Sequence, residues 1–210
     1  MKNNLAIISQ HGWKYMGYSA LIALVCLFLD FDLLALMSGL FFLFVAYVFR
    51  NPEIALQRFD TATISAVADG SVIAIEELND DEHYGYCITI DTKCLDKSIL
   101  RIPADATVLS VTHTHGANLS HTSSLAPLIN EIASIVLRVG ENEKIKIVHL
   151  AGTSFSPIVL DLLPQQQCAR GDRYGVFVHG RISLYLPKNA HISCRIAQSL
   201  RGGETSLATF

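Results

Sequence analysis

The strongest hydrophobic pattern lies near the N-terminus, where apolar residues run from Tyr15 to Leu29 and again from Leu33 to Phe49. Asp30-Phe31-Asp32 separates the two segments. A single helix over the whole stretch would be about 52 Å long, against a hydrocarbon core of about 30 Å. It would also carry two aspartates near its middle, which membrane insertion disfavours. The pattern therefore favours a hairpin of two short apolar helices, 15–29 and 33–49, over a single span or a hairpin buried in a soluble core.

The flanking charges indicate how such a hairpin would lie in a membrane. Lys14 precedes the first segment and Arg50 follows the second, so both lie on the same side of a hairpin. Positively charged flanks tend to face the cytoplasm. Each segment spans only about 22–25 Å as a helix, so the hairpin must thin the bilayer or lie shallow in it. We expect residues 1–50 to anchor the chain in the inner (cytoplasmic) membrane, with the remainder facing the cytoplasm.

After residue 50 the apolar runs become short. Residues 51–62 predict a linker, and residues 63–210 predict one β-rich domain. Its apolar runs contain many β-branched residues and are separated by turn signals, with little helical periodicity, which is typical of a mainly β fold of short strands and hairpins. The predicted strands are 63–68, 71–75, 86–90, 99–102, 108–112, 132–139, 144–150 and 182–186, with a last strand after a turn at 201–205.

Two turns predict β-hairpins, and one long segment predicts a loop. Asp69-Gly70 is a hairpin signal between the first two strands, and 140–143 joins strands 132–139 and 144–150. The strand at 144–150 alternates between apolar and polar positions, as expected when one face is buried. Residues 113–127 are rich in His, Ser, Thr, Gly and Asn and predict a long loop.

The stretch from Gly171 to Pro187 predicts a strand, a sharp turn and a second strand. The turn is placed at His179-Gly180-Arg181, and the second strand at 182–186. Glycine suits a tight bend because it tolerates positive φ.

Composition excludes some classes of function. With 16 basic and 19 acidic residues the net charge is −3, so the chain has no basic footprint for nucleic acid. Its five cysteines include no CxxC pair, which indicates free thiols in a reducing compartment.

Three histidines, His113, His115 and His121, gather in the polar segment. Histidine clusters can bind zinc. Because no cysteine or carboxylate lies at ligand spacing nearby, we expect no metal here and interpret the segment as a solvated loop. A lipid or metal site on a non-enzymatic scaffold is the alternative.

A series of short motifs, in order along nearly the whole chain, resembles the phosphatidylserine decarboxylase family, in particular its short bacterial, membrane-anchored members. Each motif is short, and the resemblance rests on their occurring in the same order in this chain as in the family. The motifs are Gly12-Trp13-Lys14, Phe49-Arg50-Asn51-Pro52-Glu53, Ala68-Asp69-Gly70, Asp96 with Arg101 and Pro103, Asn130-Glu131, Ala151-Gly152, Gly171-Asp172-Arg173-Tyr174-Gly175, Tyr185-Leu186-Pro187 and Gly203-Glu204-Thr205.

The resemblance implies a lyase of phospholipid biosynthesis that converts phosphatidylserine to phosphatidylethanolamine and CO₂. In the family, a serine in a Phe-Gly-Ser turn attacks the preceding peptide carbonyl, with an aspartate and a histidine as the base. Elimination from the resulting ester leaves a pyruvoyl group. That group binds the substrate amine as a Schiff base and accepts electrons as CO₂ leaves.

The family's site pattern is incomplete in this chain. Asp69 stands at the position of the aspartate, but Ser98 replaces the histidine. Gly180 stands before the cleavage point and Arg181 follows directly, so the processing serine is absent. Arg101 stands at a position where it could contact substrate. We expect no pyruvoyl cofactor and impaired catalysis, as in a pseudoenzyme.

Other interpretations stay open for these residues. Asp69 could simply form a turn, and Arg101 could be an ion-pair partner at a strand edge. Ser183 could be a relocated nucleophile with His179 as replacement base, giving a divergent active decarboxylase. Its odd spacing from Gly180 points it to the other face of a strand, however. The expected partners are a phospholipid membrane and an active decarboxylase paralogue or a second copy of this chain.

Overall fold

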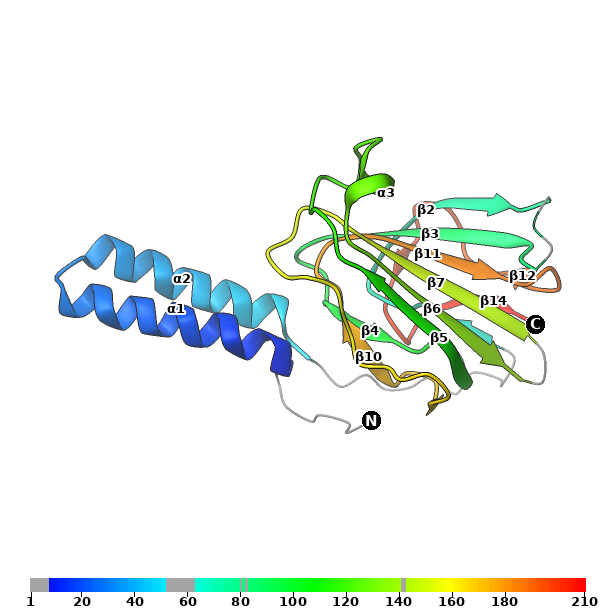
Figure 1. Cartoon of the computed structure of the whole chain (residues 1–210), viewed down its shortest axis with the longest axis horizontal. Helices are drawn as coiled ribbons and strands as arrows, with labels where there is room; N and C mark the ends of the chain where they lie inside the picture. Colours follow the sequence, from blue (N-terminus) through cyan, green and yellow to red (C-terminus); the bar gives the residue numbers. More distant parts are fainter. Residues whose placement is uncertain (1–7, 52–62, 80, 82, 141–142) are drawn as a thin grey trace. The chain divides into compact units, whose positions relative to one another are not determined.

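The chain forms two units, one helical and one built mainly of strands (Figure 1). The computed structural model describes residues 8–51, 63–79, 81, 83–140 and 143–210. The helical unit covers residues 2–53, and the strands belong to residues 54–210. The linker predicted at 51–62 lies outside the described residues, except for Asn51.

The helical unit is a hairpin of α1 (Gln10–Phe28) and α2 (Asp32–Val48). Asp30 adopts a positive φ of 57° in the turn between them. Close packing joins the two helices, because a Cβ atom on Gly12 would lie 2.7 Å from the Cβ of Phe49. The Ser38 hydroxyl also donates a hydrogen bond to the Ser19 carbonyl at 2.7 Å. The structure thus has one helix at each of the two apolar segments, with α1 beginning five residues earlier than its segment.

Both helices of the hairpin expose large apolar side chains, including Trp13, Leu24, Phe28, Leu33 and Leu43. Neither helix has both the length and the apolar character of a membrane-crossing segment, and the same holds for every other helix in the described residues. Insertion of the hairpin in a membrane stays a prediction.

The strands of the described residues form three antiparallel sheets, which confirms the predicted mainly β fold. The largest sheet has eight strands in the order β13-β2-β3-β11-β7-β6-β5-β9, and two three-stranded sheets have the orders β1-β14-β12 and β4-β10-β8. The strand bounds are β1 Thr63–Ser65, β2 Gly70–Glu77, β3 Tyr86–Thr92, β4 Ile99–Arg101, β5 Ala106–Thr114, β6 Ile132–Val139, β7 Glu143–Ala151, β8 Val159–Leu160, β9 Gln167–Cys168, β10 Arg173–Val176, β11 Gly180–Leu186, β12 His191–Ile192, β13 Ser199–Leu200 and β14 Ser206–Thr209.

The hydrophobic core joins one face of the large sheet to the two small sheets. Alternate residues of β7 and β11 are buried, among them Ile145, Ile147, Ile182 and Leu184. They belong to one cluster with buried residues of the small sheets, such as Tyr174 of β10. This alternation is the pattern that the sequence predicted for residues 144–150.

The hairpin predicted at Asp69-Gly70 is wrong. β1 pairs with β14, whereas β2 pairs with β3 and β13. Residues 66–68 are buried core residues that hydrogen-bond to other loops, for instance Ala66 N–H to the Thr205 carbonyl at 2.8 Å. The chain therefore crosses from one sheet to another at this point instead of reversing.

Two further boundaries differ from the prediction, while the hairpin of β6 and β7 is confirmed. The loop predicted at 113–127 is shorter, because β5 continues to Thr114 and a short helix, α3 (Ala126–Ile129), begins at Ala126. The break before the strand at 182–186 lies at residues 177–179, since β11 already begins at Gly180.

Candidate functional site

Five strand ends meet at one end of the large sheet and carry the candidate site. Gly180 at the start of β11 pairs with Thr92 at the end of β3 and with Ala151 at the end of β7. The start of β6 at Ile132 in turn lies opposite the end of β5 at Thr114. Residues that are up to 88 positions apart in the sequence are thereby brought together, and α3 lies at the same end (Figure 1).

Gly180, the residue before the expected cleavage point, has no space for a side chain. Its φ is 144°, and a Cβ atom would collide with the Leu150 carbonyl oxygen and lie 2.7 Å from the Gly152 nitrogen. The Thr92 hydroxyl donates a hydrogen bond to the Gly180 carbonyl oxygen at 3.0 Å. That oxygen belongs to the Gly180–Arg181 peptide, so the carbonyl is held by a donor of the kind that stabilises an oxyanion.

A buried histidine that is paired with a partly exposed aspartate lies beside this peptide. The His121 Nε2 atom is 2.9 Å from an Asp91 carboxylate oxygen, and the His121 side chain is 9 % exposed. Because a carboxylate only accepts hydrogen bonds, Nε2 carries the proton and Nδ1 is left as an acceptor. Burial lowers the pKa of His121, an effect that the nearby Asp91 charge opposes. Nδ1 is itself buried, with no hydrogen-bond partner among the described residues.

Glycine at position 152 lets two imidazoles approach Gly180. A Cβ on Gly152 would lie 2.7 Å from His121 Nδ1 and 3.0 Å from His179 Cδ2. The two histidine rings meet edge to face, with centroids 4.9 Å apart. His179 Nδ1 donates to the Thr92 carbonyl at 2.8 Å, which fixes its ring.

The arrangement supplies a base and a polarised carbonyl but lacks the attacking hydroxyl at the family's position. An oriented Asp–His pair is the base of serine nucleophile systems. The hydroxyl that contacts the Gly180 carbonyl, from Thr92, donates to its oxygen. A pyruvoyl group, which must be made from a serine after Gly180, does not fit the residues present. Asp91, Thr92 and the role of His121 were not predicted, because no sequence motif links them.

The three family positions Asp69, Ser98 and Arg101 lie outside this cluster of histidines. Asp69 precedes β2, and β3 separates it from β11. Its carboxylate accepts a hydrogen bond from Gly202 N–H at 2.8 Å and lies 3.5 Å from the Lys97 ammonium. These contacts fit the structural role that the sequence left open for Asp69.

Ser98 and Arg101 are buried around β4. The Ser98 carbonyl accepts a hydrogen bond from Phe177 N–H at 2.8 Å, which ties it to the break before β11. Arg101 donates to the Gly171 carbonyl at 3.0 Å. Burial, with a further contribution from Arg173, lowers the pKa of Arg101 to about 10. Whether Arg101 contacts substrate stays a prediction.

Ser183 lies in the middle of β11, between Thr89 of β3 and Val148 of β7. It is on the opposite face of the strand from the buried residues Ile182 and Leu184, as its odd spacing from Gly180 predicted. It neighbours the Cys87 thiol, whose pKa is raised by burial. A regular strand paired on both sides gives Ser183 no tight turn of the kind that self-processing uses.

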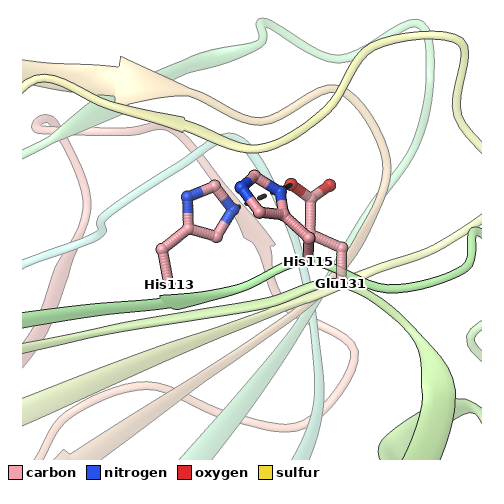
Figure 2. Close-up of side chains that lie close together, drawn as sticks. All are labelled: His113, His115 and Glu131. Carbon is pink, nitrogen blue, oxygen red and sulfur yellow. Dashed lines mark hydrogen bonds and ion pairs between the residues drawn. The ribbon is translucent and has the colours of Figure 1, made fainter.

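A second group of side chains joins His113 and His115 to Glu131 (Figure 2). His113 Nε2 is 2.8 Å and His115 Nδ1 is 3.7 Å from the same Glu131 oxygen. Residues 114–120 are exposed, as the predicted solvated loop requires, but the expectation that no carboxylate lies near these histidines is wrong. His113 belongs to β5, and pairing of β5 with β6 brings in Glu131, which directly precedes β6. The sequence places Glu131 in the Asn130-Glu131 motif but does not indicate that it contacts the two histidines.

Asn130 fixes the loop that carries these groups. Its side-chain amide donates to the carbonyls of Leu119 and Ala151, at 2.8 and 2.7 Å, and its oxygen accepts from Leu119 N–H at 3.1 Å. Glu131 N–H donates to the Ala117 carbonyl at 2.9 Å. The Asn130-Glu131 motif therefore ties the polar loop to the end of β7.

The comparison with protein families agrees with the motifs. Residues 41–208 match the model of a family described as phosphatidylserine decarboxylase. A phosphatidylserine decarboxylase proenzyme of Geobacter metallireducens is 30 % identical over 99 % of this chain and 98 % of its own length. The proenzyme of Desulfotalea psychrophila is 30 % identical over 95 % of both chains, and that of Ehrlichia chaffeensis is 32 % identical over 77 % of this chain and 74 % of its own. This chain belongs to the phosphatidylserine decarboxylase family.

Proposed function

We propose that this chain is a family member that does not cleave itself and therefore forms no pyruvoyl group. It would act in phospholipid biosynthesis at a membrane without catalysing decarboxylation, in a regulatory or scaffolding role. The observation that carries the proposal is that the backbone around Gly180 leaves no space for a side chain and that Arg181, not a serine, follows directly.

The chemistry of the family step supports this proposal. Self-processing requires a hydroxyl on the residue after the scissile carbonyl, activated by a base. Here that residue is Arg181, whose guanidinium has no nucleophilic character at neutral pH because it stays protonated. The Asp91–His121 pair could act as a base, and the Thr92 hydroxyl could stabilise an oxyanion. The residue after Gly180, however, offers no hydroxyl for this base to activate.

The hairpin of α1 and α2 supports the membrane part of the proposal. Its exposed apolar side chains would be costly in water and favourable against lipid. In the proposed orientation Lys14 and Arg50 face the cytoplasm. An active decarboxylase paralogue or a second copy of this chain is the proposed protein partner.

The proposal is tested by decarboxylation of phosphatidylserine labelled at the serine carboxyl group, presented in vesicles to the full chain. We expect no CO₂ release above a protein-free blank. Release that is lost in Ser183→Ala would instead establish Ser183 as a relocated nucleophile. Ser134→Ala is a matched control, because Ser134 and Ser183 lie on opposite sides of the same β7 residue, Val148.

A further inference from the structure

We propose that His113, His115 and Glu131 form a binding site for one divalent transition-metal ion of the zinc type. The site is separate from the cleavage position and does not depend on whether the chain cleaves itself. Figure 2 shows the two imidazoles turned toward the same carboxylate. The ligand atoms of the three side chains all lie within 4.8 Å of one another.

The spacing of the three groups is close to that of a zinc site. Two atoms that each bind a tetrahedral zinc ion at about 2.1 Å are about 3.4 Å apart. The distances to the Glu131 oxygen are 2.8 Å from His113 Nε2 and 3.7 Å from His115 Nδ1. Shifts of about 0.3–0.6 Å, which side-chain rotation can supply, would bring these two distances to the ideal spacing. The ligand atoms of the two imidazoles lie within 4.8 Å of each other.

The burial of Glu131 is the second observation that points to a cation. Its side chain is only 4 % exposed, and within the described part of the chain its ion-pair partners are His113 and His115. A buried carboxylate is costly unless a positive charge or a metal compensates it. A bound dication would supply that charge.

The Glu131 carboxylate is also held in position, as metal ligands usually are. Its second oxygen accepts a hydrogen bond from the Ile158 backbone N–H at 3.1 Å. Such outer contacts orient a ligand and are a regular feature of protein metal sites. One oxygen is thus fixed by the backbone while the other faces the two histidines.

The donor set selects the class of metal. Two imidazoles and one carboxylate suit zinc and neighbouring first-row ions, whereas magnesium and calcium prefer oxygen ligands alone. Three protein ligands leave at least one coordination position, and the 85 % exposure of the His115 side chain puts the site at the surface. An ion bound here would therefore keep a position open to water or an anionic ligand.

The test is a titration of the full chain with zinc ions. The chain is purified in mild detergent without a polyhistidine tag, stripped with a chelator, and its accessible thiols are alkylated because the five cysteines are free. Zinc is then added in competition with a chromophoric chelator. We expect one equivalent to bind, and replacement of zinc by cobalt to give the visible absorption of a nitrogen- and oxygen-ligated ion.

The variants decide the assignment. His115→Ala removes an exposed ring and leaves the core intact, so it should lower zinc affinity at least about tenfold without affecting folding. Glu131→Gln should lower it as well, and His191→Ala, which removes an exposed histidine of β12, should not. No saturable zinc binding, or the same affinity in His115→Ala as in the unmodified chain, would overturn the proposal.

Discussion

At Gly180, two backbone neighbours and a φ of 144° make glycine a requirement of the local fold. The position resembles a family cleavage site in sequence, but its backbone is packed as the first residue of a fully paired strand. A serine that replaces Gly180 would therefore clash with the backbone, and it would not supply the hydroxyl on the residue after Gly180 that self-processing needs.

We predict that Gly180→Ser destabilises the β unit by about 1–3 kcal/mol and does not produce cleavage, because the new Cβ collides with the Leu150 carbonyl. Gly140→Ala is the control, since Gly140 also has positive φ, at 61°, but no atom of the described residues lies within 4 Å of its Cβ position. Urea unfolding of both variants measures the difference. Equal losses of unfolding free energy in the two variants would show that the collision with the Leu150 carbonyl does not contribute to the destabilisation.

A second prediction concerns His149, which is buried in the core between β6 and β10. It contacts the Ala133 carbonyl at 3.0 Å and the Tyr174 hydroxyl at 2.8 Å, and burial lowers its pKa to about 4. The unfolded chain, with a histidine pKa of about 6.5, takes up a proton that the folded chain does not. Stability should therefore fall as pH drops from about 6.5 to about 4, by up to roughly 3 kcal/mol.

Chemical denaturation of the unmodified chain and of His149→Gln at pH 7.5 and pH 5 measures how much of the loss of unfolding free energy comes from His149. The variant should lose less stability on acidification than the unmodified chain, because glutamine does not titrate. An identical loss in both would assign the acid sensitivity to other groups.

At the scale of elements, local patterns predicted most strands but not their partners. The β6–β7 hairpin was predictable because two strands flank a short turn. Asp69-Gly70 carries an equally strong turn signal, yet β1 pairs with β14, which lies at the other end of the domain sequence. Pairing between strands so far apart in the sequence depends on packing over the whole core. A short stretch of sequence therefore does not predict it.

The helical hairpin gives a prediction at this scale. Leu24→Asp, at an exposed apolar position of α1, should weaken binding of the chain to phospholipid vesicles at least about tenfold, because an aspartate at membrane depth costs about 2.5–3.5 kcal/mol. Leu128→Asp changes a leucine of α3 that is even more exposed and should leave binding unchanged. Vesicle flotation measures both. Equal binding of Leu24→Asp and the unmodified chain would contradict insertion of the hairpin.

For the molecule as a whole, the sequence predicted the family, the mainly β fold and the missing serine. The candidate site was only partly predictable. Asp91 and His121 are 30 residues apart, and Glu131 lies 18 residues after His113, so their contacts exist only once β3, β5 and β6 take their places in the sheet. Conversely Asp69, which a motif singled out, lies across β3 from Gly180.

The whole molecule also places a histidine, His121, that is not the family's base beside a peptide that lacks its nucleophile. His121 has an acceptor nitrogen close to Gly152 and Gly180, and Thr92 holds the Gly180 carbonyl. Because both the hydroxyl and the histidine of the family pattern are absent at their positions, the chain should remain a single polypeptide however long it is stored in the folded state.

The intact mass of the chain, purified from membranes in mild detergent, tests this claim most directly. A single species at the full 23.1 kDa is the result we expect, because without a serine after Gly180 no ester and no pyruvoyl group can form. Two fragments that part between Gly180 and Ser183, the smaller with a blocked N-terminus, would contradict the account and show that the chain processes itself with a relocated nucleophile.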